Sequence, residues 1–188
     1  PYQEAKIRAV RSKKQKQTDR MVVISSIHSG KTLESLALGL SELLPELEII
    51  YKLRPEERDG WRSVYTAELA SRQNIRVADS GEPDLYELFA TSKYQLGINS
   101  TAMVEGLAFG LTTFIVKVGW YTDMASLIEK ELVFLVSEAG EIAEKIISGE
   151  QPRCRPVVEE MFKPESVQNL HRALETVTGV WATRRQEV

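Results

Sequence analysis

Side chains that can bind phosphate gather directly after the apolar segments of this chain. The stretch SSIHSGKT, residues 25–32, supplies Ser26, His28 and Ser29 just before a segment with helical spacing. Hydroxyl groups and backbone N–H groups at the start of a helix bind anions, because the helix dipole places partial positive charge there. The spacing therefore predicts a phosphate-binding loop at this point.

The same stretch allows two other interpretations. Its Gly-Lys-Thr ending is typical of an NTP-hydrolysing P-loop, but the glycine required five residues before Gly30 is Ser25 here. Without that glycine the backbone cannot easily wrap around the phosphates, so a looser phosphate site is favoured. The simpler alternative is that Ser29 only caps the helix.

A second polar group, Asn99, Ser100 and Thr101, precedes the apolar segment AMVEGLAF at residues 102–109. Glu105 follows Thr101 by four residues, so the two lie on the same side of a helix. A carboxylate beside a phosphate cradle is suited to accept hydrogen bonds from a ribose diol. The alternative is a capped helix with an exposed glutamate, but the apolar neighbours favour burial, where a carboxylate requires a partner.

Two further loops carry weaker signals. Arg54 ends an apolar segment and precedes a proline, so its guanidinium can offer several donors to a phosphate. The alternative is a surface ion pair with Glu56 or Glu57. Ser80 lies in the turn-forming stretch DSGEPD, residues 79–84, which could lie against a nucleotide base.

The composition argues against several classes of protein. A net charge of −3 and a pI of about 5.6 over 188 residues are unlike a dedicated nucleic-acid binder. A single cysteine excludes an intrachain disulfide and a cysteine-based zinc site. The chain has no Asp-x-Asp motif and no His/Asp cluster with metal-ligand spacing. We therefore expect no metal and no other cofactor.

The elements that position these residues alternate along the chain. Short apolar or β-branched segments predict strands at residues 21–27, 48–53, 74–78, 94–98, 112–118 and 132–136. Helical spacing and capping residues predict helices at residues 31–44, 61–71, 84–91, 100–109, 123–130, 137–147 and 166–178. The last helix is expected to turn four apolar residues inward: Val167, Leu170, Leu174 and Val177.

This alternation predicts an α/β fold with a doubly wound, Rossmann-like sheet of six parallel strands. In such a sheet, ligands bind beyond the carboxyl ends of the strands, where the strand order switches direction. The polar loops all leave carboxyl ends of predicted strands, so we expect them along one edge.

The two ends of the chain carry separate expectations. Residues 1–20 are polar and basic and are predicted to form a linker or an incoming segment, with a phosphate- or membrane-surface patch as the alternative. Residues 21–188 are expected to form one domain. Because the chain opens at Pro1 rather than at a methionine, we expect a fragment of a longer protein.

The polar loops resemble the C-terminal, donor-binding half of GT-B-fold glycosyltransferases, over roughly residues 21–140. Within that class the chain looks most like teichoic-acid glycerophosphotransferases, capsule glycosyltransferases and bacterial sialyltransferases. GINSTAMVEGLAFG, residues 97–110, resembles their Ser/Thr-pair element followed by glutamate, and residues 84–97 resemble the segment before it. YKLRP, residues 51–55, resembles their K-x-H-P element, with Arg54 in place of the histidine.

The arginine at position 54 changes which roles of the family's histidine can be expected in this chain. Arginine keeps the positive charge and the donors but cannot act as a general acid near neutral pH. Phosphate binding by Arg54 therefore stays an expectation. A proton-transfer role and the assignment to the sialyl- and glycerophosphotransferase branch are placed in doubt.

The resemblance implies a binding site for a nucleotide-activated sugar or polyol made of nine residues: Ser26, His28, Ser29, Arg54, Ser80, Asn99, Ser100, Thr101 and Glu105. By this resemblance, phosphate would be bound by Arg54, Ser100 and Thr101, and ribose by Glu105. His28 would contact the donor sugar or cap the helix.

The implied reaction is a metal-independent transfer in which helix N-termini and Arg54 stabilise the leaving diphosphate. The catalytic base of such enzymes usually lies in an N-terminal, acceptor-binding half. We therefore expect this chain alone to bind the donor but to turn over slowly or not at all. The expected setting is surface-polysaccharide synthesis in the cytoplasm, or at the inner face of the membrane in the full-length protein.

Two other functions stay open. A nucleotide-sugar 2-epimerase uses a similar nucleotide domain, although its full Arg- and Glu-rich signature is not found here. A non-catalytic α/β module could bind a nucleotide or a protein partner, and an exposed aromatic surface at Trp120 and Tyr121 would suit it. The alternative for these aromatics is a lid or a rim that packs on the core.

Overall fold

Six parallel strands form one sheet in the order β3-β2-β1-β4-β5-β6. The computed structural model describes residues 18–80, 83–152, 165 and 168–176. The strands are β1 (Thr18–Ile24), β2 (Glu48–Lys52), β3 (Ile75–Ala78), β4 (Ser92–Gly97), β5 (Thr112–Val116) and β6 (Phe134–Val136). The strand order, which reverses between β1 and β4, confirms the predicted doubly wound, Rossmann-like fold.

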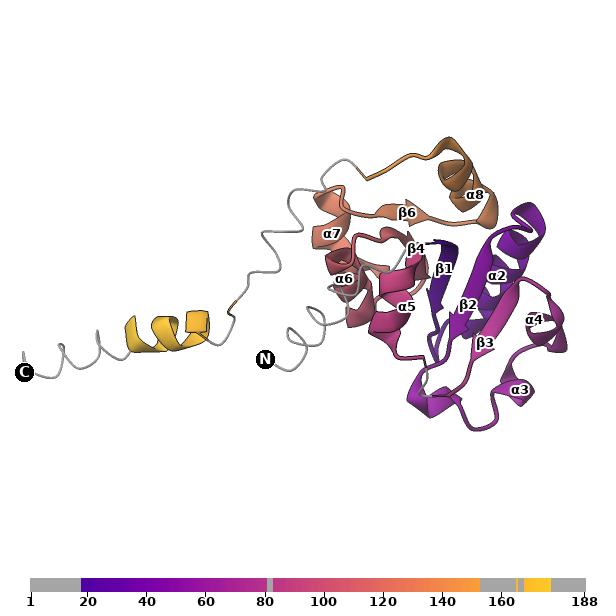
Figure 1. Ribbon diagram of the computed structural model, residues 1–188, viewed down its shortest axis with the longest axis horizontal. Coiled ribbons are helices and arrows are strands. Elements are labelled where there is room, and N and C mark those ends of the chain that lie inside the picture. The colour runs from indigo at the N-terminus through magenta and orange to yellow at the C-terminus, as the bar shows by residue number, and fades with distance from the viewer. Residues whose placement is uncertain (1–17, 81–82, 153–164, 166–167, 177–188) are drawn as a thin grey trace, which may run out of the picture.

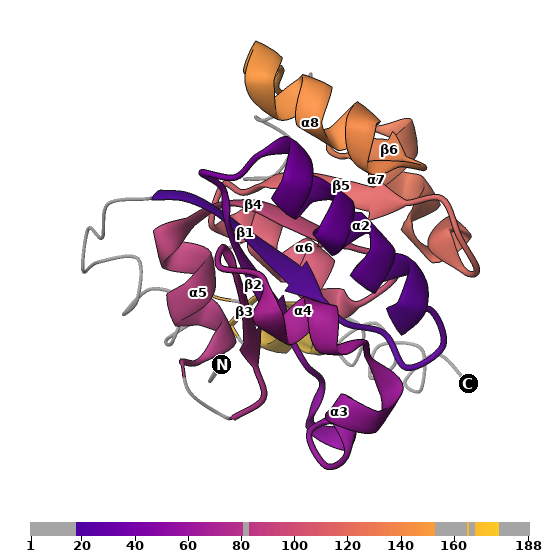
Figure 2. The same cartoon turned by 90° about the vertical axis from the view of Figure 1, so that its right-hand side faces the viewer.

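Helices cover both faces of the sheet (Figures 1 and 2). One face carries α2 (Gly30–Leu43), α4 (Ala67–Ser71) and α8 (Ala139–Ser148). The other carries α5 (Leu85–Thr91), α6 (Thr101–Ala108) and α7 (Ala125–Glu129). Three short elements lie in the connections: η1 (Pro55–Glu57), α3 (Trp61–Val64) and η2 (Tyr121–Met124).

The central strand β1 shows why its sequence is continuously apolar. Met21 and Val23 belong to the core under α2, whereas Val22 and Ile24 belong to the core under α5 and α6. Successive side chains of a strand point to opposite faces, and here both faces are covered. Because both faces of β1 are buried, its residues do not alternate between apolar and polar as they would in a strand with one face exposed to solvent.

Helix α6 approaches β4 unusually closely. Gln95 on β4 is fully buried, and its side-chain amide donates to the carbonyl of Met103 (2.8 Å) and to the hydroxyl of Thr113 (2.7 Å). A Cβ atom on Gly106 would collide with that amide group. Glycine at position 106 therefore allows α6 to pack closely against the strand.

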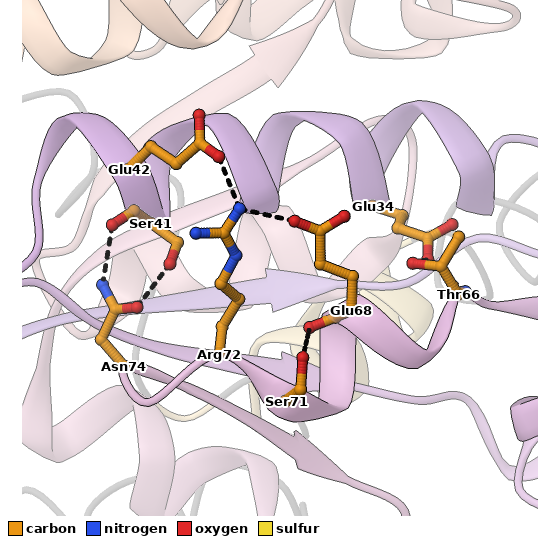
Figure 3. Close-up of polar contacts among 8 residues, drawn as sticks. All are labelled: Glu34, Ser41, Glu42, Thr66, Glu68, Ser71, Arg72 and Asn74. Carbon is orange, nitrogen blue, oxygen red and sulfur yellow. Dashed lines mark hydrogen bonds and ion pairs between the residues drawn. The ribbon is translucent and has the colours of Figure 1, made fainter.

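A polar network fastens α2 to α4 and to the turn before β3 (Figure 3). Asn74 donates to the carbonyls of Leu44 (3.3 Å) and Leu47 (3.2 Å), just past the end of α2. Arg72 bridges Glu42 and Glu68 at 2.5 Å each. This network, called the α2 flank below, comprises Glu34, Ser41, Glu42, Thr66, Glu68, Ser71, Arg72 and Asn74.

The predicted helix over residues 61–71 is wrong: it is divided into α3 and α4, because Tyr65 and Thr66 are extended. The cause lies 32 residues earlier, at Glu34. Its carboxylate accepts hydrogen bonds from the N–H (2.5 Å) and the hydroxyl (2.7 Å) of Thr66. These bonds hold Thr66 outside helical geometry.

The last helix also differs from the prediction. Residues 168–176 are helical, but Leu170 and Leu174 are 59% and 51% exposed rather than turned inward. Val167 and Val177 lie outside the described residues, as does most of the predicted basic segment 1–20, whose last three residues belong to β1. Among the helices that the structure describes, none is both long and apolar enough to cross a membrane.

Candidate functional site

A cavity of about 620 Å³ opens at the carboxyl edge of the sheet, where the strand order reverses between β1 and β4. The loops after β1 and β4 run to opposite faces at this point, so they separate and leave a crevice. Six of the nine predicted residues line it: Ser26, His28, Ser29, Arg54, Asn99 and Ser100. Ser80, Thr101 and Glu105 are not part of its lining.

The loop after β1 presents the start of α2 to the cavity. Ser29 occupies the N-cap position, but its side chain makes no capping hydrogen bond. Its carbonyl instead accepts from the N–H groups of Thr32 (3.1 Å) and Leu33 (3.2 Å). The interpretation that the Ser29 hydroxyl merely caps the helix is therefore wrong, and Ser29 lines the cavity.

Arg54 reaches the cavity from the end of β2. Its side chain is exposed, and within residues 18–80 and 83–152 it forms no ion pair. The alternative of a surface pair with Glu56 or Glu57 is therefore wrong. A guanidinium without a carboxylate partner at the mouth of a hydroxyl-lined cavity is placed to bind an anion.

The carboxylate of Glu57 anchors the loop after β2, which carries Arg54. This carboxylate accepts hydrogen bonds from the backbone N–H of Arg54 (3.0 Å), the hydroxyl of Ser25 and the hydroxyl of Tyr65 (2.6 Å). Burial raises the pKa of Tyr65, so its hydroxyl stays a donor. Glu57 therefore links the loops after β1 and β2 and fixes the backbone from which Arg54 projects.

The loop after β4 is anchored on both sides. Ser100 caps α6, because its hydroxyl accepts from the N–H of Ala102 (3.3 Å). The Asn99 side chain donates to the carboxylate of Asp123 (3.0 Å), which lies in η2 after β5. The Asn99 side chain therefore connects the loop after β4 with the loop after β5. Its position next to Ser100 in the sequence does not predict this role.

Lys52 organises the loop after β3. Its ammonium group donates to the carbonyls of Ser80 (3.0 Å) and Pro83 (3.3 Å), and only 9% of the residue is exposed. Burial lowers the pKa of this ammonium group. A lysine at the end of an otherwise apolar buried strand is the sequence signal that could have pointed to it.

Glu105 lies beside Tyr86 on α5, outside the cavity lining. It is half-buried rather than exposed, and it accepts a hydrogen bond from the Tyr86 hydroxyl. Burial raises the pKa of Glu105, and the bond from Tyr86 only partly offsets this. Burial and the negative charge of Glu105 raise the pKa of Tyr86 to about 12. The alternative of an exposed glutamate is wrong.

The remaining wall of the cavity is aromatic. Trp120, which follows β5, is 66% exposed, and its ring lies 5.9 Å from that of His28. Tyr121 is half-buried and packs against both cores. The predicted rim packing therefore describes Tyr121 but not Trp120.

The described part of the chain holds no group of three or more His, Cys, Asp or Glu side chains that could bind a metal ion. The absence of a metal requirement stays a prediction.

Solved structures match this fold, whereas no family model and no curated protein sequence matches the chain. UDP-GlcNAc 2-epimerase of Methanocaldococcus jannaschii, in complex with UDP-GlcNAc and UDP, aligns with 91% of the chain at a TM-score of 0.61 and 14% identity. The pneumococcal O-GlcNAc transferase GtfA, in complex with UDP and GlcNAc, aligns with 87% at 0.64 and 14% identity. A variant of the wall teichoic acid polymerase TagF aligns with 97% at 0.58 and 11% identity.

These similarities show the fold of one half of a GT-B enzyme. The alignment covers 48%, 37% and 48% of the three proteins, so the chain spans about half of their length or less. Transferases and an epimerase match about equally well, so the fold does not distinguish the subtypes.

Proposed function

We propose that this chain is the donor-binding half of a GT-B glycosyltransferase that binds a nucleotide-activated sugar or polyol at the carboxyl edge of its sheet. One observation carries the proposal: the starts of α2 and α6 and the side chain of Arg54 open on a single cavity at the reversal of strand order. This arrangement offers two positive helix ends and one cation to the same anion.

The cavity chemistry fits a diphosphate. Ser26, Ser29 and Ser100 supply hydroxyl groups, and Arg54 supplies a charged fork of donors. During transfer, negative charge accumulates on the leaving diphosphate, and donors fixed in advance stabilise that charge without reorganising. Glu57 keeps the Arg54 backbone in place for this task.

The nucleoside end would extend from the cavity toward α5. Glu105 is one helical turn beyond Thr101, and its carboxylate can accept hydrogen bonds from a ribose diol. The loop that contains Ser80 would lie against the base, on carbonyls that Lys52 holds. Ser80, Thr101 and Glu105 thus stay in the proposed site although they do not line the cavity.

The finer assignments are also proposals. An acceptor-binding N-terminal domain of the parent protein would supply the catalytic base, transfer would proceed without a metal, and this chain alone would be slow or inactive. Synthesis of capsule, teichoic acid or another surface polysaccharide in the cytoplasm, or at the inner face of the membrane, is the proposed setting.

A nucleotide-sugar 2-epimerase-like domain is the second candidate, because the epimerase is as similar in fold, at a TM-score of 0.61, as the transferases at 0.64 and 0.58. The two candidates share donor binding and differ in the reaction. Conversion of UDP-GlcNAc to its 2-epimer by the parent protein, without an acceptor, would favour the epimerase.

Calorimetric titration of the chain with UDP, CDP, CMP and GDP tests the proposal. We expect binding of one of them in the micromolar to low-millimolar range. Arg54→Ala should weaken it about tenfold or more, as expected for a lost charge-assisted hydrogen bond. Arg62→Ala is the matched control, because Arg62 is 75% exposed and lies outside the cavity lining.

Three outcomes would contradict the proposal. Binding of none of the four nucleotides would favour a protein-interaction module. An equal loss in both arginine variants would show that general charge, rather than the cavity, attracts the nucleotide. Hydrolysis of ATP would favour the P-loop interpretation.

A further inference from the structure

Trp120 is an exposed aromatic side chain held by an ordered backbone. Gly119 before it has a φ of +55°, in the left-handed region that favours glycine. The carbonyl of Trp120 accepts from the N–H of Asp123 (3.1 Å), and the Asp123 carboxylate is bound by Asn99 (3.0 Å). The turn is thus fixed on both sides, while 66% of Trp120 stays open to solvent.

The neighbours of Trp120 do not hide it. Met124, in the same short segment, is buried, and Tyr121 is half-buried against both cores. The segment therefore has apolar anchors of its own, and Trp120 is not needed for packing. Its ring contacts His28, at 5.9 Å between centroids with the planes tilted by 52°, and both residues line the cavity.

The two sides of the cavity carry different kinds of side chain. Arg54 approaches from the β2 side of the β1–β4 reversal, with Ser26 and Ser100 between, and Trp120 approaches from the β5 side. A phosphate held by the hydroxyl groups and Arg54 would leave the aromatic wall to the group attached to that phosphate. An aromatic wall offers apolar area but few donors, so it fits a group that has an apolar face.

We infer that Trp120 and His28 form a wall that packs against the ring of the transferred sugar, so that the site takes a hexopyranosyl donor rather than an acyclic polyol phosphate. This inference rests on the proposed function. A pyranose ring presents a flat face of C–H groups that can cover an indole, whereas a glycerol chain has no such face. Trp120 is therefore a specificity-determining residue for the transferred group.

Matched ligand pairs test the inference on the full 188-residue chain. Calorimetry compares UDP with UDP-GlcNAc, GDP with GDP-mannose, and CDP with CDP-glycerol. UDP and UDP-GlcNAc are natural probes, since the similar epimerase structure holds both. Each pair shares its nucleotide, so the ratio of the two Kd values isolates the transferred group.

We expect Trp120→Ala to weaken binding of the sugar nucleotide that the chain prefers by about tenfold, or about 1.4 kcal/mol. The matching nucleoside diphosphate should change less than about twofold, because phosphate and base contacts stay. Trp120→Phe, which keeps an aromatic face, should lose less than Trp120→Ala. Ile27→Ala is the control, because Ile27 is 54% exposed nearby but does not line the cavity.

Each other result overturns the inference. If Trp120→Ala weakens both members of a pair equally, Trp120 contacts the nucleotide. If it changes neither, the wall has no role, and if CDP-glycerol responds as a sugar nucleotide should, the ring is not what is recognised. Failure of the unmodified chain to bind any nucleotide in the three pairs overturns the inference, and if CMP does not bind either, the proposed function is overturned with it.

Discussion

The α2 flank and the cavity at the start of the same helix are both rich in polar side chains, but they use them differently. Along the flank, whose residues Figure 3 draws, Glu34, Arg72 and Asn74 each bind two or more partners. At the cavity, the side chains of Ser26, Ser29 and Arg54 make no hydrogen bond to any residue that the structure describes. The polar groups along the side of α2 thus stabilise the fold, whereas those around the start of α2 are open to a ligand.

Two glutamates sharpen this contrast. Burial alone would raise the pKa of Glu34, but hydrogen bonds from Thr66 and Lys31 outweigh it and lower the pKa below its usual value. The pKa of Glu105 is raised instead, because its burial is opposed only by the bond from Tyr86. Hydrogen-bond donors of the folded chain thus outweigh burial at Glu34 but not at Glu105.

The largest effect should come from removing the flank glutamate. Glu34→Ala leaves the N–H and hydroxyl of Thr66 without their acceptor and should lower the free energy of unfolding by about 3 kcal/mol. Chemical denaturation monitored by circular dichroism measures this. Nucleotide affinity of the folded protein should stay unchanged, since Glu34 does not line the cavity.

Glu42→Ala is the matched control on the same helix. Glu42 is 61% exposed and pairs with Arg72, which keeps its second partner, Glu68. An exposed pair of this kind contributes about 0–1 kcal/mol. If Glu42→Ala lowered the free energy of unfolding as much as Glu34→Ala does, the distinction between buried and exposed members of the α2 flank would be wrong.

An intermediate effect is expected at Glu57, which lies outside both regions but binds Tyr65 and the backbone of Arg54. Glu57→Gln keeps one acceptor oxygen but removes another from a group with three donors, so the unfolding free energy should fall by about 1 kcal/mol. Because the backbone of Arg54 is then less firmly held, nucleotide affinity should fall about threefold. Paired denaturation and calorimetry measure both, and an unchanged affinity would show that Glu57 supports only the fold.

The smallest effect concerns pH. Since the pKa of Glu105 is raised, the carboxyl protonates above the ordinary value of 4.5 as pH falls. Under the proposed function, protonation removes an acceptor for the ribose, so nucleotide affinity should weaken over that range, and Glu105→Gln should abolish this step. The same shift makes the unliganded fold more stable as pH falls through the raised pKa.

Glu34 should titrate with the opposite sign. Its lowered pKa stabilises the fold above the ordinary value of 4.5, and this contribution is lost as pH falls further toward the lowered pKa. Calorimetric titrations from pH 7 down to the ordinary value of 4.5 follow Glu105, and denaturation below pH 4.5 follows Glu34. An identical pH profile of binding in Glu105→Gln would contradict the role of Glu105.

The elements with continuous local patterns could be predicted from the sequence. The apolar runs of β1 and β5 identify strands buried on both faces, and Ser100 followed by an apolar segment identifies the start of α6. The fold class follows from that alternation, and the edge that carries the cavity follows from the fold class. Six of the nine predicted residues lie in the cavity for this reason.

The features that were missed depend on partners distant in the sequence. Thr66 interrupts a helical pattern because of Glu34, 32 residues away. Asn99 binds Asp123, 24 residues away, and Lys52 binds the carbonyl of Ser80, 28 residues away. Local spacing says nothing about such pairs. Helical spacing alone also could not show that Leu170 and Leu174 stay exposed.

The close contact between Gly106 and Gln95 has an evolutionary consequence. Since a Cβ atom at position 106 would enter the space of the Gln95 amide, the two positions cannot vary independently. Among homologues that keep glutamine in this strand, glycine should be invariant in the helix. Homologues that accept alanine there should carry a shorter residue in the strand, so an alignment should show these two columns covarying.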